Sequence, residues 1–330
     1  MSDYTGPVEL SKGTIVGELW KVDKKIGQGG SAAVYKALNV ESNKLAALKV
    51  ESNFVQGGSM LKFEVDILTR MAGKRHVPQL FDSGKNSALH FMAMSLLGRS
   101  VNALLKKCDR SFSPSTQLRI ALYALHGLKQ IHDIGYVHRD VKTGNLALGR
   151  SPDTDNNMVY LLDFGMARRF VVKNDSDELI MRAPRARCPF RGTPKFTSIP
   201  SHERAEQGRC NDLWSWLYVV AEMREPLPWT GVIDESEILE QKRNTSDEQL
   251  LCKGDPQLVS IATHLRTLDY FSRPDYTLIY QALMDSMRDG GHRFSDKWDW
   301  EHEKDLESES PFCAEDFAAD PLGVGAESSC

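Results

Sequence analysis

The hydrophobic pattern changes character partway along this chain of 330 residues. Residues 20–95 carry short runs whose side chains alternate between two faces, as in LAALKVES (residues 45–52), which is typical of β-strands. From about residue 114, apolar residues recur at helical spacing, as in STQLRIALYALHGLKQIHDIG (residues 115–135). Strands followed by helices predict an α+β fold, with a small β-rich lobe, a hinge near residues 95–98 and a larger, mainly helical lobe.

The small lobe is expected to contain one main helix, over SMLKFEVDILTRM (residues 59–71). Ser59 is a suitable N-cap, and Glu64 and Leu68 share one face of this helix. The apolar face that we expect to be buried consists of Met60, Phe63, Ile67 and Met71. In the larger lobe, NDLWSWLYVVAEM (residues 211–223) is apolar on most sides, which predicts a helix at the centre of that lobe.

Composition and charge exclude several classes of protein. No apolar run approaches the ~18 residues that a membrane span needs, and the N-terminus lacks the pattern of a secretory signal. Six cysteines without a CxxC pair indicate reduced thiols inside the cell. A net charge of −4 argues against general nucleic-acid binding. We therefore expect a monomeric protein of the cytoplasm, with access to the nucleus and without nucleic-acid or membrane partners.

The last thirty residues differ in composition from the rest of the chain. Residues 301–330 contain nine acidic side chains and one basic one, Lys304. This composition predicts a flexible acidic tail over residues 304–330. The tail is either passive or folds back on a basic segment as a pseudosubstrate.

The segment HRDVKTGNLA (residues 138–147) gathers His, Arg, Asp, Lys and Asn beside apolar residues. One interpretation is a solvated turn capped by Asn145. The other is a phosphoryl-transfer loop, in which Asp140 accepts a proton, Lys142 neutralises phosphate charge and Asn145 holds a metal.

The segment IGQGGSAAVYKA (residues 26–37) is either a plain hairpin or a glycine-rich loop whose backbone approaches phosphates. Ala32 stands where such loops usually carry a third glycine. Lys49, on the next predicted strand, is in a position to reach the phosphates of a nucleotide, and Glu64 is its natural partner.

The segment LLDFGMARRF (residues 161–170) could simply end a strand at Asp163. Since it follows HRDVKTGN, it also fits a carboxylate that binds Mg²⁺ together with Asn145. The glycine loop, strand lysine, catalytic loop and DFG each occur once and in this order, which favours a kinase over coincidence.

The chain resembles eukaryotic protein kinases over about residues 20–303. TSIPSHE (residues 197–203) replaces the usual Ala-Pro-Glu ending of the activation segment and is similar to that of the casein kinase 1 group. LKFEVDIL, RGTPKFTSI, NDLWS, LPW, LDYFSRPDY and DWE resemble the tau-tubulin kinase branch of that group. The resemblance implies a bilobal kinase fold with an N-lobe at 20–94, a hinge at 95–98 and a C-lobe at 99–303, flanked by an extension at 1–19 and the acidic tail.

The resemblance also implies a role for each site residue, with ATP and Mg²⁺ as cofactors. Asp140 and Lys142 would be catalytic, and Asn145 and Asp163 would hold the metal. Lys49, braced by Glu64, would orient the α- and β-phosphates. Leu68, Thr193 and Asp212 would support the site. The remaining nucleotide-binding positions are Ile26, Gly27, Gln28, Gly29, Gly30, Val34, Ala47, Met94, Leu96 and Ala147.

On the substrate side, residues 179–200 hold five basic residues and no acidic one. The interpretation as an anion-docking surface is favoured over a solvated basic face, because arginine forks suit phosphate. Ile233 replaces a lysine usual in the family, which predicts a weaker preference for phosphorylated substrates. The docking residues would be Arg139, Arg168, Arg185, Arg191 and Lys195.

These features predict an active kinase that phosphorylates Ser or Thr hydroxyls of proteins, including acidic or cytoskeletal ones. The alternative is a pseudokinase that serves as a binding scaffold. Against the scaffold stands the presence of Lys49, Glu64, Asp140, Asn145 and Asp163, since an inactive relative would usually have lost one of them.

Overall fold

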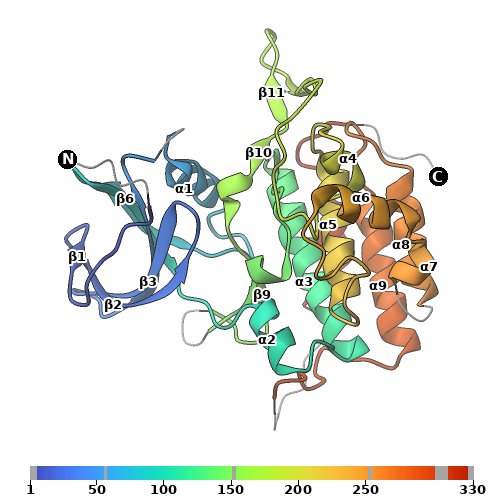
Figure 1. The fold of residues 1–330 in the computed structure, drawn as a ribbon, viewed down its shortest axis with the longest axis horizontal. Helices are drawn as coiled ribbons and strands as arrows, with labels where there is room; N and C mark the ends of the chain where they lie inside the picture. The colour runs from blue at the N-terminus through green and yellow to red at the C-terminus, as the bar shows by residue number, and fades with distance from the viewer. Residues whose placement is uncertain (1–5, 56–57, 151–153, 252–254, 302–310, 326–330) are drawn as a thin grey trace. The chain divides into compact units, whose positions relative to one another are not determined.

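The computed structural model describes residues 6–55, 58–150, 154–251, 255–301 and 311–325, and Figure 1 shows its ribbon. The chain forms two compact units. The small unit takes the chain up to Arg99 together with Ala147–Gly165, and the large unit takes Ser100–Leu146 and everything from Met166 onward. The small unit is rich in strands and the large unit in helices, so the predicted α+β class is confirmed.

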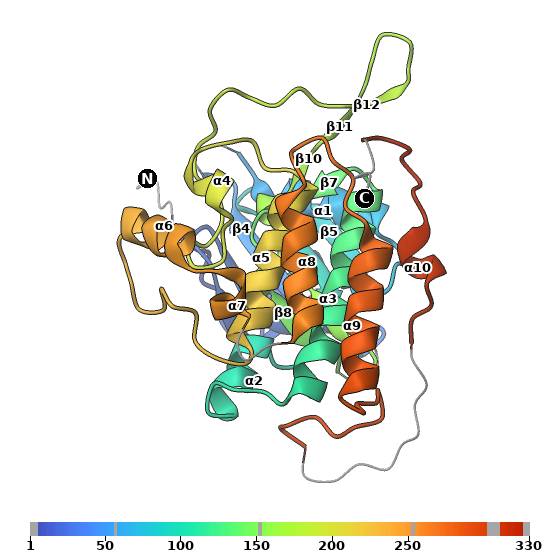
Figure 2. The same cartoon turned by 90° about the vertical axis from the view of Figure 1, so that its right-hand side faces the viewer.

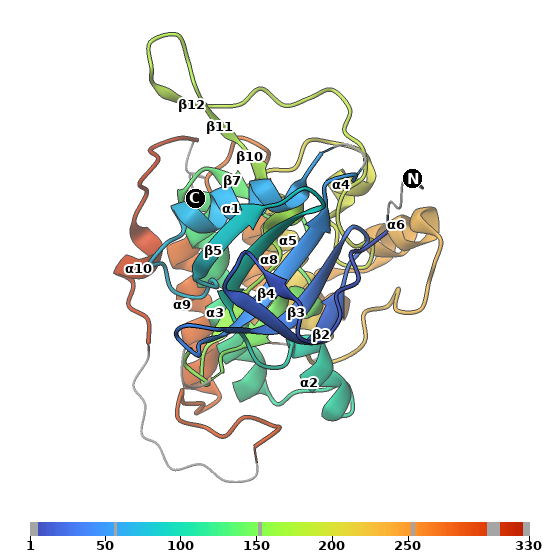
Figure 3. The ribbon, with the colours of Figure 1, turned by 90° about the vertical axis from the view of Figure 1, so that its left-hand side faces the viewer.

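A six-stranded antiparallel sheet makes up most of the small unit, in the order β1-β2-β3-β4-β6-β5 (Figure 3). Its core forms on one face, where Trp20, Tyr35, Leu48 and Phe91 are buried together. The alternating runs noted in the sequence place these side chains on the same face. The strands are β1 (Ile15–Val16), β2 (Trp20–Gln28), β3 (Ala32–Asn39), β4 (Leu45–Ser52), β5 (Leu80–Lys85) and β6 (Leu89–Ser95).

The main helix of the small unit is α1 (Met60–Arg70), which begins where the sequence predicts. The Ser59 hydroxyl accepts a hydrogen bond from the Lys62 backbone N–H at 3.2 Å. Of the expected face, Ile67 and Met71 are buried, Phe63 is half-buried and Met60 is exposed. The helix also buries Leu61, Glu64 and Leu68, and the apolar pattern missed this part of the face because a glutamate lies within it.

The segment before residue 20 belongs to the small unit and is not a separate extension. β1 pairs with β2, and Val16 is buried in the sheet core. The Tyr35 hydroxyl donates to the Val8 carbonyl at 2.9 Å and accepts from the Leu10 N–H at 2.9 Å. These contacts tie the described part of the N-terminal segment to β3.

Residues 147–165 were expected in the larger lobe, but their contacts group them with the small unit. They contain β9 (Val159–Leu161), which pairs with β8 (Leu146–Leu148). The Leu161 N–H donates to the His76 carbonyl at 2.8 Å, and His76 Nδ1 lies 3.0 Å from the Val159 carbonyl oxygen. Pairing over a long sequence separation fixes this segment, which a linear reading of the chain does not reveal.

The helices α3, α5, α8 and α9 lie side by side in the large unit (Figure 2). The central helix α5 is buried along almost its whole length, as its sequence predicts. Two short strand pairs, β7 with β10 and β11 with β12, accompany the helices. The helices are α2 (Val101–Lys107), α3 (Pro114–Asp133), α4 (Ile199–His202), α5 (Arg209–Glu222), α6 (Glu235–Asn244), α7 (Asp247–Leu250), α8 (Pro256–Arg266), α9 (Tyr276–Asp289) and α10 (Glu315–Ala318), and the strands are β7 (Tyr136–Val137), β10 (Arg168–Arg169), β11 (Val171–Lys173) and β12 (Leu179–Met181).

The C-terminal segment differs from the expected flexible tail. Phe317 is fully buried and stacks on Tyr280 of α9, with ring centroids 4.5 Å apart. The Ala319 carbonyl accepts a hydrogen bond from Lys129 of α3 at 2.8 Å. The prediction of a flexible tail was therefore wrong for residues 311–325, because a few buried apolar side chains hold this acidic segment on the helices. Residues 304–310 and 326–330 lie outside the described residues.

Across the described ranges, no helix has both the length and the apolar character required to cross a membrane.

Replacing Phe317 by alanine should lower the free energy of unfolding by about 3–5 kcal/mol, because a fully buried aromatic side chain is lost. Urea denaturation followed by fluorescence measures the effect. Phe54→Ala, at an exposed phenylalanine, is the matched control and should change stability little. Equal stability of Phe317→Ala and wild type would mean that the segment does not pack as described.

Candidate active site

In the small unit, the predicted nucleotide lysine lies between two carboxylates. Lys49 of β4 places its Nζ 2.5 Å from Glu64 Oε2 of α1 and 3.0 Å from Asp163 Oδ1. Burial by itself would lower the pKa of Lys49, but the negative charges of Glu64 and Asp163 raise it above its usual range. The amine is therefore a fixed positive charge, held by the partner that the sequence predicted and by one more.

Glu64 also holds the backbone of the DFG segment. Its Oε1 accepts a hydrogen bond from the Phe164 N–H at 3.3 Å, and Phe164 is fully buried. Asp163 has a φ of 64°, a left-handed conformation that is uncommon outside glycine. Such a conformation persists only where neighbouring contacts support it. Leu68, one turn after Glu64, is buried on the same helix.

The glycine-rich loop is the turn between β2 and β3, closed by a hydrogen bond from the Gly29 N–H to the Ala32 carbonyl at 2.8 Å. A Cβ added at Gly30 would meet nothing within 4 Å, so the loop leaves open space beside its backbone. Ala32 begins β3 and is buried, so the methyl group that replaces the third glycine is accommodated in the strand. Ile26 and Gln28 lie in β2, as does Gly27, and the Gln28 side chain is hydrogen-bonded to Lys25.

The other predicted nucleotide-binding positions also lie in the small unit. In the sheet register, Val34 of β3 is opposite Lys49, and Ala47 of β4 is opposite Met94 of β6. The Gly98 N–H donates to the Leu148 carbonyl at 2.8 Å, and the Leu148 N–H donates to the Arg99 carbonyl at 3.1 Å. These bonds join the hinge to β8, so Leu96 and Ala147 come from neighbouring segments, and both are buried.

In the large unit, three of the predicted residues contact a fourth, Asp140. Asp140 is buried, and its Oδ2 accepts from Lys142 Nζ at 2.6 Å while its Oδ1 accepts from the Thr193 hydroxyl at 2.8 Å. Asn145 Nδ2 donates to the Asp140 carbonyl at 2.9 Å. The catalytic loop and the activation segment thus converge on Asp140.

A second carboxylate, Asp212 of α5, fixes the backbone of the catalytic loop. It accepts from the N–H groups of His138 at 2.6 Å and Arg139 at 2.8 Å, and from His132 Nε2 at 2.9 Å. Burial would raise the pKa of Asp212, but the hydrogen bonds from His132 and from the Arg139 N–H lower it below its usual value. The carboxylate is therefore ionised and fully hydrogen-bonded.

His132 and Tyr276 support Asp212, and no sequence pattern predicts this role. His132 Nδ1 lies 2.6 Å from the Tyr276 hydroxyl, and burial lowers the pKa of this histidine, which is neutral. Since Nε2 must donate to Asp212, Nδ1 accepts from the tyrosine. Both residues look like ordinary helix positions in the sequence, and only the packing of α3 against α5 and α9 brings them together.

Some of the predicted docking cations lie close together, but they pair with buried glutamates of the protein itself. Glu206, whose side chain is 2% exposed, accepts from Arg185 Nε at 2.6 Å and lies 3.2 Å from Arg168 Nε. Lys195 pairs with Glu222 of α5. Arg139 Nε donates to the Met166 carbonyl at 2.7 Å, while the Arg191 carbonyl accepts from Gln207 at 3.2 Å. The glutamates that neutralise this surface were missed because they lie outside the basic stretch.

A further residue missed from the sequence is Lys242 of α6, which is 4% exposed. Its Nζ donates to the carbonyls of Pro194 at 2.7 Å and Thr197 at 2.5 Å. The rings of Tyr218 and Trp229 lie within 5.2 Å of the same nitrogen. Burial lowers the pKa of Lys242 to about 7, and the negative charge of Glu235 partly offsets this effect. Lys242 thereby links α6 to the end of the activation segment.

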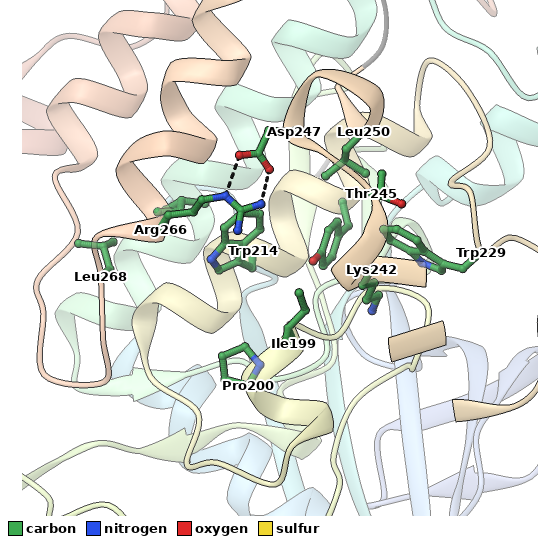
Figure 4. A pocket seen from close by; sticks show the side chains of 12 residues that line it. Ile199, Pro200, Trp214, Trp229, Lys242, Thr245, Asp247, Leu250, Arg266 and Leu268 are labelled. Atoms are coloured by element: carbon green, nitrogen blue, oxygen red, sulfur yellow. Dashed lines mark hydrogen bonds and ion pairs between the residues drawn. The ribbon is translucent and has the colours of Figure 1, made fainter. Parts of the chain in front are cut away.

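Lys242 also lines a pocket of about 270 Å³ (Figure 4). Arg266 and Asp247 form a two-point ion pair at its rim, with distances of 2.7 and 2.6 Å. Trp214 and Trp229 form part of the wall. None of the predicted catalytic or metal-binding residues lines this pocket, so it is separate from the Asp140 cluster.

Replacing Asp212 by asparagine should destabilise the protein by about 1–3 kcal/mol, because an amide has one acceptor oxygen for three N–H donors. Urea denaturation measures the loss. Asp175→Asn, at an exposed aspartate, is the matched control and should have no effect. Unchanged stability of Asp212→Asn would show that the catalytic loop does not depend on this carboxylate.

Comparison with known proteins agrees with the geometry. The protein kinase domain family matches residues 20–285. A Caenorhabditis elegans protein named as a serine/threonine-protein kinase is 39% identical over 98% of this chain and 100% of its own length. Casein kinase I homolog 2 of Schizosaccharomyces pombe is 30% identical over 88% of this chain and 67% of its own. An inactive tau-tubulin kinase of Caenorhabditis elegans is 31% identical over 76% and 90%.

The family match covers most of the chain, and the relatives above are named as a serine/threonine-protein kinase, a casein kinase I and a tau-tubulin kinase. The chain therefore belongs to the serine/threonine protein kinases, in the casein kinase 1 group and on its tau-tubulin kinase branch.

Proposed function

We propose that this kinase transfers the γ-phosphoryl group of ATP to Ser or Thr hydroxyls of proteins in a reaction that requires Mg²⁺. The observation that carries the proposal is the cluster around Asp140, where Lys142, Thr193 and Asn145 each contact the same residue. A solvated turn would not need a buried carboxylate with three polar partners.

The side chains at the proposed metal positions suit Mg²⁺, which prefers carboxylate and amide oxygens. Asn145 Nδ2 donates to the Asp140 carbonyl, which leaves the amide oxygen for a metal. Asp163 supplies a carboxylate whose side chain is 46% exposed. Bound Mg²⁺ would neutralise charge on the phosphates of ATP.

The chain's own groups account for the remaining steps. Asp140 would accept the proton of the acceptor hydroxyl as its oxygen attacks the γ-phosphorus and the bond to ADP breaks. Thr193 donates to one oxygen of Asp140 and so orients the other. Lys142 would stabilise the phosphoryl group in transfer, and Lys49 would bind the α- and β-phosphates. Positioning and charge stabilisation supply most of the catalysis in such reactions.

Acidic or phosphorylated substrates should be favoured only weakly. Glu206 already accepts from Arg185 and lies beside Arg168, and Glu222 pairs with Lys195. An incoming phosphate must compete with these carboxylates. Ile233, where the family usually has a lysine, is 95% exposed and adds no charge.

We also propose a cytoplasmic location and cytoskeletal substrates. The location rests on the cysteines, since the four described ones are Cys108, Cys188, Cys210 and Cys313 and all are unpaired. Cytoskeletal substrates rest on the resemblance to tau-tubulin kinases alone.

The alternative is a pseudokinase that serves as a binding scaffold. One finding favours it, since a relative at 31% identity is named as inactive. Against it, Lys49, Glu64 and Asp163 are joined by ion pairs, and Asp140 is oriented by its neighbours. A scaffold would not require these contacts.

Replacing Asp140 by asparagine should reduce kcat by about 10²-fold or more, because the proton acceptor is removed while the shape of the side chain is kept. Incorporation of radiolabelled phosphate into casein measures turnover. Asp175→Asn is the control, and its rate should equal that of wild type. If wild type incorporates no more phosphate than Asp140→Asn, the scaffold interpretation replaces the enzyme.

Replacing Ile233 by lysine should raise the preference for substrates with a phosphoserine upstream of the acceptor by about two- to fivefold, since an exposed charge contributes little energy. Peptide arrays with phosphoserine, acidic or neutral residues upstream measure the ratio of rates. Val40→Lys, at another exposed apolar residue, serves as the control. Equal rates on all arrays, in wild type and in Ile233→Lys, would refute anion docking.

A further inference from the structure

The C-terminal segment at residues 311–325, here called the strap, has two anchors on the large unit. The first anchor consists of Phe312 and Phe317. Phe317 stacks on Tyr280 of α9, and Phe312 lies with its ring centroid 5.3 Å from that of Tyr123 in α3. Figure 2 shows α10, the short helix of the strap, beside α9. This anchor makes its ring contacts with α3, with α9 and with Phe294, which follows α9.

Between the anchors, the strap is held by polar contacts. Asp320 Oδ2 lies 3.2 Å from Arg273 Nε, and Arg273 also donates to the Ala319 carbonyl at 3.2 Å. Lys129 donates to the same carbonyl at 2.8 Å. The acidic residue of this part of the strap thus pairs with a cation of the framework, outside the basic stretch of the activation segment.

The second anchor is Val324, which is 6% exposed and forms a buried cluster with Val137, Phe170 and Val171. Val137 ends β7 directly before His138 and the catalytic loop. Phe170 and Val171 follow β10 in the activation segment. Val324 of the strap, with the partly buried Leu322 beside it, therefore packs against the residues that lead into the catalytic loop and the activation segment.

The backbone at the second anchor is bound to Arg209, the first residue of α5. Arg209 donates to the Val324 carbonyl at 3.2 Å and places its guanidinium 4.9 Å from the Phe170 ring. Gly325 has a φ of 90°, and a Cβ there would collide with the Arg209 guanidinium. The close approach at this point requires glycine. Arg209 lies three residues before Asp212, which holds the catalytic loop.

We propose that Val324 is a positioning residue, through which the strap holds β7 and β10 and so the catalytic loop and the activation segment. The proposal rests on the proposed kinase function. β7 and β10 pair over only two residues each, and so short a pair is not stable without packing on its surface. Val324 supplies part of that packing. The strap therefore supports kinase activity, whereas a pseudosubstrate tail would inhibit it.

The two anchors allow a matched test in the full-length protein. Val324→Ala removes packing against β7 and the start of the activation segment, whereas Phe312→Leu weakens the anchor that packs on Tyr123 and His126 of α3. Val40→Ala, at an exposed valine, controls for the change in side chain. Four quantities are measured for each variant: kcat with casein, KM for ATP, the midpoint of thermal unfolding, and the rate of tryptic cleavage at Arg185, Arg187 and Arg191.

Val324→Ala should lower kcat about 15-fold, the order expected for losing two buried methyl groups, and leave KM for ATP unchanged. Tryptic cleavage within residues 182–191 should accelerate by a similar factor. Phe312→Leu should lower the unfolding midpoint at least as much as Val324→Ala while kcat and cleavage stay at the wild-type values. A kcat that follows the unfolding midpoint in both variants would show a merely structural role and overturn the proposal.

The remaining outcomes also decide the question. A rise of kcat in Val324→Ala would overturn the proposal in favour of an inhibitory strap. Unchanged kcat and unchanged cleavage would overturn it as well. If wild type has no kinase activity, the proposed function fails, and the difference in cleavage between Val324→Ala and Phe312→Leu still tests whether the strap orders the activation segment.

Discussion

The large unit depends on one buried carboxylate, Asp212, which accepts hydrogen bonds from backbone N–H groups that are not paired with a β-strand. Arg139 has a φ of 69°, which takes the chain out of the extended conformation directly after β7. The N–H groups of His138 and Arg139 therefore have no partner strand, and unpaired buried donors are costly. Asp212 accepts from both, and His132 supplies the third hydrogen bond that its charge needs. Asp140 can lie where it does because this turn is stabilised from α5.

In the small unit, too, a buried carboxylate accepts a hydrogen bond from a backbone N–H next to a left-handed residue. Asp163 has a φ of 64°, and the next N–H, that of Phe164, is accepted by the buried Glu64. Glu64 in turn needs a positive partner, because a buried charge is tolerated only when it is paired. Lys49 is that partner. The left-handed residue is Arg139, next to the candidate Asp140, in the large unit, and the candidate Asp163 itself in the small unit. In both units a carboxylate from a helix stabilises the backbone at this turn.

The sequence predicted what is local and missed what depends on packing. The α+β class, α1 with its Ser59 cap and the pairing of Lys49 with Glu64 follow from short patterns and motif order. The supporting partners were not predictable in this way. Tyr276 lies 144 residues from His132, and nothing in the pattern of either helix marks the contact. Buried charged residues such as Lys242 look like surface positions, since the hydrophobic pattern assigns every lysine to solvent.

The basic stretch of the activation segment illustrates the limit of reasoning from composition. Counted along the chain, residues 179–200 contain only positive charge, which favours a docking surface for anions. In the folded unit, Glu206 and Glu222 come from outside the stretch and are nearly buried. Each would be unstable there without a cation, because desolvation of a carboxylate costs several kcal/mol unless it is paired.

Part of the positive charge is therefore needed by the fold itself, to pair with these two nearly buried glutamates. Arg185 gives Glu206 a two-point contact, which is the strongest arrangement an arginine can offer a carboxylate. A phosphate that displaced Glu206 would leave a buried negative charge without its partner. The exposed Arg187 and Arg191 carry charge that would be open to an anionic substrate without this penalty.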